Sequence, residues 1–91
     1  MKYEGDPKKA AANFVAHGVS FDSAQDFEWD SALEWYDEMH SDAEDRYIAL
    51  GFIGDVLHVL VHTKRGAKVR IISLRKASKR ERKYYAESQD F

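Results

Sequence analysis

A run of strand patterns, broken by two turn signals, constrains the fold of this chain most strongly. Three segments rich in β-branched and aromatic residues follow one another, covering Arg46 to Phe52 or Ile53, Val56 to Thr63, and Lys68 to Arg75. Short glycine-containing connections separate them, Gly54-Asp55 and Lys64-Arg65-Gly66-Ala67, and such connections are typical of hairpins. The sequence therefore predicts a three-strand antiparallel meander.

A basic helix is expected directly after the third strand. Ser78 and Glu81 have the spacing of a capping box, in which a hydroxyl and a carboxylate satisfy the free amide groups at a helix start. The spacing predicts a helix from about Lys79 to Glu87. Lysines and arginines dominate this segment, so the helix brings a concentrated positive charge next to the sheet.

The N-terminal part of the chain predicts helices. Asp6-Pro7 is a strong helix start, and Gly18 is a typical residue after the last helical turn, so we expect a helix from Lys8 to about His17. Its apolar stripe is predicted to be Ala11, Phe14 and Val15. Ser20 can cap a second, short helix from Phe21 to about Phe27.

The remaining segments are short. Met1 to Glu4 could be an edge strand, Leu33 to Tyr36 favours another strand, and the polar segment Glu38 to Glu44 reads as a loop. The order is two helices, then mostly strands, then a helix. This segregation predicts an α+β domain with an antiparallel sheet of three to four strands, whose helices cover one face and leave the other free for a ligand.

Size and composition limit the class of protein. A chain of 91 residues fits one domain, residues 1–91, with a modest core. The absence of cysteine excludes disulfides and thiolate metal sites. No apolar run approaches the roughly 18 to 20 residues that cross a bilayer, and the first residues lack the apolar region of a secretory signal. We therefore expect a cytoplasmic protein without membrane contact.

The net charge of -2 hides a strong segregation. Residues 22–45 contain ten carboxylates and no Lys or Arg, whereas residues 64–83 contain ten cations and one carboxylate. A segregated basic surface attracts phosphate locally even on an acidic protein. The alternative is that the two segments are solvated faces that balance each other.

Few residues are suited to chemistry. Dinucleotide, phosphate-loop, zinc and calcium motifs are all missing from the sequence. His58 and His62 would stand about 13 Å apart in a strand, too far for a shared metal, so no metal site is expected. Arg46, Arg70 and Arg75 lie at or near strands, where a guanidinium can bind phosphate bidentately and stabilise developing charge. Alternatively, each pairs with a carboxylate of the acidic segment.

Several sequence blocks together resemble one family. They are Asp6-Pro7-Lys8-Lys9-Ala10, Asn13, His17-Gly18-Val19-Ser20-Phe21, His40-Ser41, Asp45-Arg46, Val69-Arg70-Ile71-Ile72-Ser73-Leu74-Arg75-Lys76-Ala77 and Arg80-Glu81-Arg82. The combination resembles the BrnT toxins of type II toxin–antitoxin systems over nearly the whole chain, from Tyr3 to about Glu87.

The resemblance implies a RelE-like α+β fold and a ribonuclease that cleaves RNA and inhibits translation. It also implies a BrnA-type ribbon-helix-helix antitoxin as partner, with DNA contacted only through the toxin–antitoxin complex. The residues it brings to the active site are Lys9, His17, Arg46, Arg70 and Arg75. The basic residues after them, which could hold RNA or the antitoxin, are Lys76, Lys79, Arg80, Arg82 and Lys83.

The chain departs from the family pattern at three positions. Gly5 stands where an aromatic residue usually precedes the Asp-Pro helix start, Ala16 stands where a basic residue is common, and His62 replaces a frequent tyrosine. These departures could weaken stacking on RNA or the charge of the site.

Cleavage without a metal or other cofactor is consistent with these residues. RNA supplies its own nucleophile, the 2′-hydroxyl, so the protein needs proton transfer, for which His17 or Lys9 is the candidate, and cations for the phosphate, for which the arginines are candidates. Two other classes remain open. In these, the basic helix either holds nucleic acid without cutting it or docks an acidic protein partner.

Overall fold

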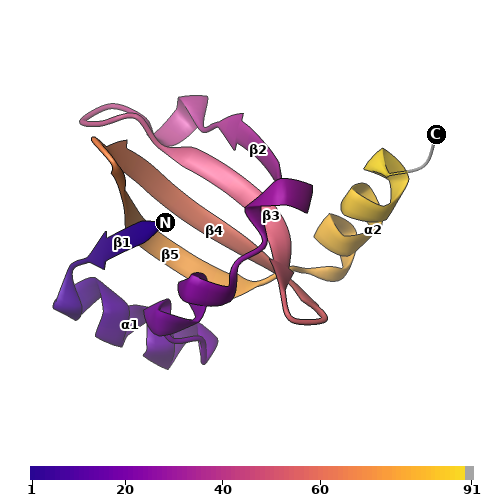
Figure 1. Cartoon of the computed structure of the whole chain (residues 1–91), viewed down its shortest axis with the longest axis horizontal. Coiled ribbons are helices and arrows are strands. Elements are labelled where there is room, and N and C mark those ends of the chain that lie inside the picture. Colours follow the sequence, from indigo (N-terminus) through magenta and orange to yellow (C-terminus); the bar gives the residue numbers. More distant parts are fainter. Residues whose placement is uncertain (90–91) are drawn as a thin grey trace.

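Residues 1–89 are described by a computed structural model, shown in Figure 1. In chain order the strands and α-helices are β1 (Lys2–Gly5), α1 (Pro7–His17), β2 (Leu33–Tyr36), β3 (Tyr47–Ile53), β4 (Val56–Arg65), β5 (Lys68–Lys76) and α2 (Lys79–Ser88). Three short 3-10 helices join them: η1 (Phe21–Asp26), η2 (Trp29–Ser31) and η3 (Glu38–His40). The α+β class and the C-terminal helix are confirmed.

The sheet has five strands in the order β1-β5-β4-β3-β2. Strands β3, β4 and β5 form the predicted antiparallel meander, and β2 extends it beside β3. The prediction of a purely antiparallel sheet of three to four strands is wrong, because β1 pairs in parallel with β5, with Tyr3 opposite Val69. β1 and β5 can pair in parallel because α1 and all the elements up to β4 lie between them in the chain.

The sheet has one well-covered face, called the first face here. Helices α1 and η1 pack on it, and its buried residues are Val19, Phe21, Ala24, Phe27, Ala49, Leu60, Ile71 and Leu74. The opposite side of the sheet is called the second face. It carries a smaller buried cluster of Leu50, Leu57 and Val59, which is covered by Ala77, just before α2, and by Tyr85 of α2. Helix α2 therefore covers only one end of the second face, and the rest stays open (Figure 1).

Helix α1 begins and ends as predicted but packs differently. Asp6 accepts a hydrogen bond from the Lys8 backbone N–H, and Gly18 has the left-handed conformation with φ of 69° that ends the helix. The predicted apolar stripe is wrong, since Phe14 is 57% and Val15 88% exposed. The residue that α1 buries is Asn13.

Asn13 is buried because its amide replaces missing backbone partners. Its Nδ2 donates to the carbonyl oxygens of Val19 (3.0 Å) and Leu74 (2.7 Å), and its Oδ1 accepts from the Leu74 N–H (3.1 Å). A buried amide with three hydrogen bonds is well satisfied. One polar residue thus ties α1 to β5, where the sequence pattern had suggested an apolar contact.

The second predicted helix is a 3-10 helix, η1. Ser20 caps it as expected, by accepting from the Asp22 N–H. The tighter winding and the short length bring Phe21 and Ala24 onto the first face, and Phe27 follows in extended conformation. The ring of Phe27 packs closely against β3 at Gly51, where a Cβ atom would lie only 2.7 Å from Phe27 Cζ. Position 51 therefore has no room for a larger residue unless the ring shifts.

Candidate nucleic-acid interface

A β-bulge decides which face the β5 arginines occupy. Val61 of β4 pairs with Ser73, but the next residue, His62, pairs with Ile71, which leaves Ile72 without a partner. This extra residue shifts by one position the alternation of β5 side chains between the two faces of the sheet. As a result Arg70, opposite Thr63, shares the second face with Arg75, which lies opposite Val59.

Arg70 lies in a row of polar residues across the second face. Glu4 of β1 is its neighbour on one side and Thr63 of β4 on the other. Arg46 directly precedes β3, where its carbonyl oxygen accepts a hydrogen bond from the Asp37 N–H at 2.9 Å. It lines a separate hollow with Met39, His40, Asp42, Ala43 and Glu44.

The contacts of Arg70 are loose. Its Nη1 lies 3.9 Å from Glu4 Oε1, and the Arg70 side chain is 27% exposed. An ion pair of this length in partial contact with water contributes little to stability. The guanidinium is therefore free to exchange a carboxylate for a phosphate.

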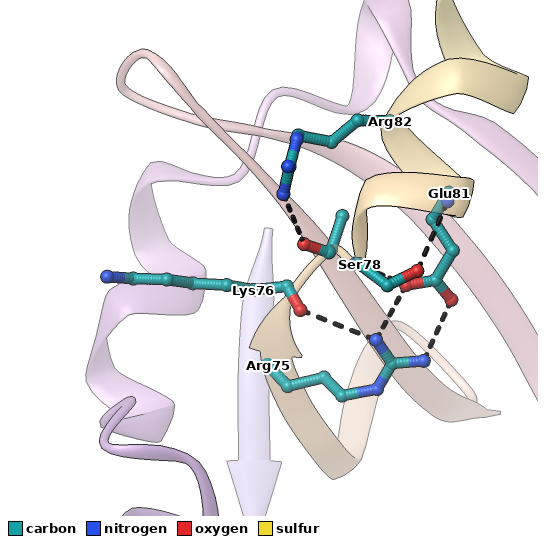
Figure 2. A network of polar contacts seen from close by, with 6 residues as sticks. Arg75, Lys76, Ser78, Glu81 and Arg82 are labelled. Carbon is teal, nitrogen blue, oxygen red and sulfur yellow. Dashed lines mark hydrogen bonds and ion pairs between the residues drawn. The ribbon is translucent and has the colours of Figure 1, made fainter.

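Arg75, in contrast, is held firmly by α2 (Figure 2). Its Nη1 and Nη2 donate to Glu81 Oε1 and Oε2 at 2.7 and 2.8 Å, a bidentate pair. Glu81 Oε1 also accepts from the Ser78 N–H, and Ser78 Oγ accepts from the Glu81 N–H, which confirms the predicted capping box. The guanidinium of Arg75, together with the capping hydrogen bonds from Ser78, lowers the pKa of Glu81 from 4.5 to about 2.

This arrangement gives Arg75 a structural task. Because both terminal nitrogens are engaged, the residue joins the end of β5 to the first turn of α2 and fixes where that helix starts. The partner carboxylates of Arg70 and Arg75, Glu4 and Glu81, lie outside the acidic segment 22–45. Pairing with that segment is found instead in the hairpin, where Arg65 meets Glu44 and Lys64 meets Glu34.

The cations after Arg75 are distributed around α2. Lys76, Lys79, Arg80, Arg82 and Lys83 are all exposed. Arg82 Nη1 donates to the Ala77 carbonyl, while Lys76 extends away from this network (Figure 2). By strand pairing with His58, Lys76 belongs to the first face, so it lies apart from Arg70 and Arg75.

Two exposed aromatic residues, one from β2 and one from the basic helix α2, lie close together at the second face. Trp35 of β2 is 42% and Tyr84 of α2 59% exposed, and their ring centroids are 6.4 Å apart. With Leu50, Arg80 and Glu81 they line a shallow hollow of about 280 Å³. Aromatic rings beside cations are the usual platform on which single-stranded nucleic acid stacks its bases.

Lys9 and His17 are not part of this surface. Both are exposed residues of α1, the helix that packs on the first face. Through Asn13, this helix is tied to the edge of β5 at Leu74. Among residues 1–89, no hydrogen bond or ion pair joins Lys9 or His17 to Arg70 or Arg75. The structure therefore brings Arg70 and Arg75 to one face of the sheet, while Lys9 and His17 lie on the helix at the edge of β5.

Sequence reasoning missed three residues of the second face and recognised the capping role of a fourth. Glu4, Thr63 and Trp35 were not considered as site residues, and Glu81 was expected only as a helix cap. Glu4 and Thr63 lie opposite Arg70, which cannot be read without the strand register. Trp35 pairs with Ile48 and meets Arg80 only in the hollow that both line. Glu81 could have been found from its spacing of six residues after Arg75, since the cap places its carboxylate near the end of the strand.

Residues 1–89 contain neither a metal-binding cluster nor a membrane-spanning helix. Within that range no cluster of three or more His, Asp or Glu side chains is arranged to hold a metal ion. Neither of the two described α-helices has the length and apolar character required to span a membrane.

Together, the fold and the second face define a small α+β protein that presents arginines and exposed aromatic rings on one face of its sheet. The chain belongs to the BrnT family, described as "Ribonuclease toxin, BrnT, of type II toxin-antitoxin system", which matches residues 6–81. The resemblance inferred from the sequence is thereby confirmed. Membership in a type II toxin–antitoxin family implies an antitoxin as partner. No match was found among curated proteins.

Proposed function

We propose that this protein is a metal-independent endoribonuclease that binds RNA on the second face of its sheet. The observation that carries the proposal is the placement of Arg70 on the same open face as the exposed rings of Trp35 and Tyr84. Cations that hold phosphates and rings that hold bases are the two elements of single-strand binding. The family description as a ribonuclease supports the choice of RNA as substrate.

In this proposal the arginines carry the phosphate chemistry. The 2′-hydroxyl of RNA attacks the adjacent phosphorus, the bond to the 5′-oxygen breaks, and negative charge increases on the non-bridging oxygens. Arg70 would stabilise that charge directly, with Arg46 as a second candidate cation. Arg75, held by Glu81, would hold α2 and its cations at the end of the RNA path.

Proton transfer has two sets of candidates. Lys9 and His17, both on α1, remain candidates from the sequence. Glu4 lies opposite Arg70 in the register, so its carboxylate could accept the proton of the 2′-hydroxyl at the same phosphate. A comparison of Glu4→Gln with His17→Ala separates the two sets.

Cleavage of a labelled RNA in the presence of EDTA tests the proposal. We expect Arg70→Ala to reduce the cleavage rate at least 100-fold, which is the order of loss for one charge-stabilising donor. Arg70→Lys should recover only part of it, because a lysine lacks the bidentate fork. Lys8→Ala is the control, since it removes an exposed cation from α1. Undiminished cleavage by Arg70→Ala would remove the second face as the active site.

The same experiment separates the other classes of function. If the protein retards RNA in a gel but produces no new termini, it is a binding module that does not cut. If neither binding nor cutting is seen while an acidic protein partner binds tightly, the basic helix is a docking surface. Growth arrest on expression, relieved by a ribbon-helix-helix protein encoded beside it, would support the proposed RelE-like toxin with a BrnA-type antitoxin and inhibition of translation.

A further inference from the structure

A second hollow lies on the first face, at the end of the β4–β5 hairpin. It has a volume of about 310 Å³, within the lower range of small-molecule sites. It is lined by Trp29, Glu34, Lys64 and Val69, together with Met1 and the exposed hairpin residues Gly66, Ala67 and Lys68. The hollow therefore combines an aromatic ring, a carboxylate and two cations.

The carboxylate of this hollow is held rigidly. Glu34 Oε2 lies 2.9 Å from His62 Nε2, and Glu34 Oε1 accepts from Lys64 Nζ at 3.2 Å. His62 is fully buried, and Lys64 also lies 4.6 Å from the ring centroid of Tyr47. Each carboxylate oxygen has a second lone-pair direction for another donor. Glu34 is thus a preorganised hydrogen-bond acceptor with a lysine beside it.

The aromatic ring is also fixed in place. Trp29 Nε1 donates to the Tyr3 hydroxyl at 2.6 Å, and its ring meets Phe27 and His62 edge to face. A ring restrained in this way loses little conformational entropy when a planar group packs against it. Within the described residues, Lys68 forms no ion pair, so its charge is available at the rim.

We propose that this hollow binds one guanine nucleotide of the RNA, beside Trp29 and Glu34. Guanine offers neighbouring N–H donors, at N1 and N2, next to its O6 acceptor. Such an edge matches a carboxylate with an ammonium group adjacent to it. Lys68 would then meet the nucleotide's phosphate at the rim.

The hollow and the second face are connected by the hairpin. Val69 lines the hollow while the next residue, Arg70, belongs to the second face, so the two sites lie back to back across one end of the sheet. An RNA strand that lies on the second face reaches the hollow by passing the hairpin tip, which carries Arg65 and Lys68. The inference rests on the proposed function, because it gives that ribonuclease a preference for guanine at a position beside the cleaved phosphate.

Trp29 fluorescence gives a direct test that does not need cleavage. In a Trp35→Phe background, GMP is titrated against the protein and compared with AMP, CMP and UMP. We expect saturable quenching by GMP with at least tenfold preference over the other three. Glu34→Gln should abolish the preference, and Lys68→Ala should weaken binding of GMP but not of guanosine. Lys8→Ala, a matched loss of one exposed lysine, should bind like the parent.

A blocking variant guards against misfolding of Glu34→Gln. Ala67→Phe adds a ring at the exposed rim without touching the pair of Glu34 and His62, and it should prevent quenching by GMP. The proposal is overturned if GMP produces no saturable change, if all four nucleotides bind equally, or if Ala67→Phe binds as tightly as the parent. RNA cleavage by Ala67→Phe distinguishes the two ideas, since loss of guanine preference with retained cleavage leaves the proposed function intact. Conversely, GMP binding by a protein that cuts no RNA would refute only the ribonuclease.

Discussion

The bidentate ion pair of Arg75 and Glu81 predicts that the free energy of unfolding decreases at low pH. Replacing Glu81 by Gln keeps an oxygen that can accept the capping hydrogen bond from Ser78 but removes the charge that binds the guanidinium. Glu81→Gln should therefore destabilise the protein at pH 7, and the loss should come from the ion pair rather than from the helix cap.

The size of the effect follows from the pKa of Glu81. A fall from 4.5 to about 2 corresponds to about 3 kcal/mol of preference for the charged form in the folded protein. The side chains of Arg75 and Glu81 are 37% and 29% exposed, so solvent screening reduces the expected loss to about 1–2 kcal/mol. Because the folded pKa is the lower one, the unfolded chain binds more protons between pH 4.5 and 2. The stabilisation is complete above about pH 4.5 and is lost as the pH falls towards 2.

Urea denaturation at pH 7, 5 and 3, followed by circular dichroism, measures the difference in free energy of unfolding between the parent and Glu81→Gln. Urea is uncharged, so it does not screen the ion pair as a salt denaturant would. The gap between parent and Glu81→Gln should be about 1–2 kcal/mol at pH 7 and should narrow clearly at pH 3. Glu87→Gln is the matched control, because Glu87 meets Lys83 at 4.0 Å with both side chains largely exposed, and it should change stability by at most a few tenths of a kcal/mol. A gap of the same size at all three pH values would refute the reasoning.

Three further predictions concern the core. Asn13→Ala should cost about 2–4 kcal/mol in urea denaturation, since it leaves the Leu74 N–H without its partner in a buried contact; a loss below 1 kcal/mol would contradict this. Gly51→Ala should cost about 1–3 kcal/mol by thermal or urea unfolding, because its Cβ would lie 2.7 Å from Phe27 Cζ, and an unchanged stability would show that the ring moves freely. Burial lowers the pKa of His62, so the parent should lose stability relative to His62→Phe as the pH falls below about 6.5, and equal pH profiles would argue against it.

Much of the local structure could be predicted from the sequence. Asp6-Pro7 and Gly18 determine where α1 begins and ends, Ser78 and Glu81 determine the start of α2, and the turn signals separate the three strands of the meander. These features depend on residues within a few positions of one another. Local hydrogen bonds and backbone preferences are sufficient to specify them.

The packing face of α1 could not be predicted in the same way. Phe14 and Val15 have the spacing of an apolar stripe, yet they are exposed, and Asn13 is buried. The free energy of burying Asn13 depends on the carbonyl and amide groups of Val19 and Leu74, and Leu74 is 61 residues away. An amphipathic pattern carries no information on such distant polar partners.

The sequence by itself determined the strands, the helix caps and the family to which the chain belongs. The tertiary structure decided which side chains share a face. Strand β1 supplies Glu4 to the row of Arg70 only because it pairs with the far end of the chain, and the bulge at Ile72 turns Arg70 onto the open face with Arg75. A shift of one residue in register reverses every side chain of a strand, and register is set by contacts between distant segments. The site is therefore a property of strand pairing rather than of any one motif.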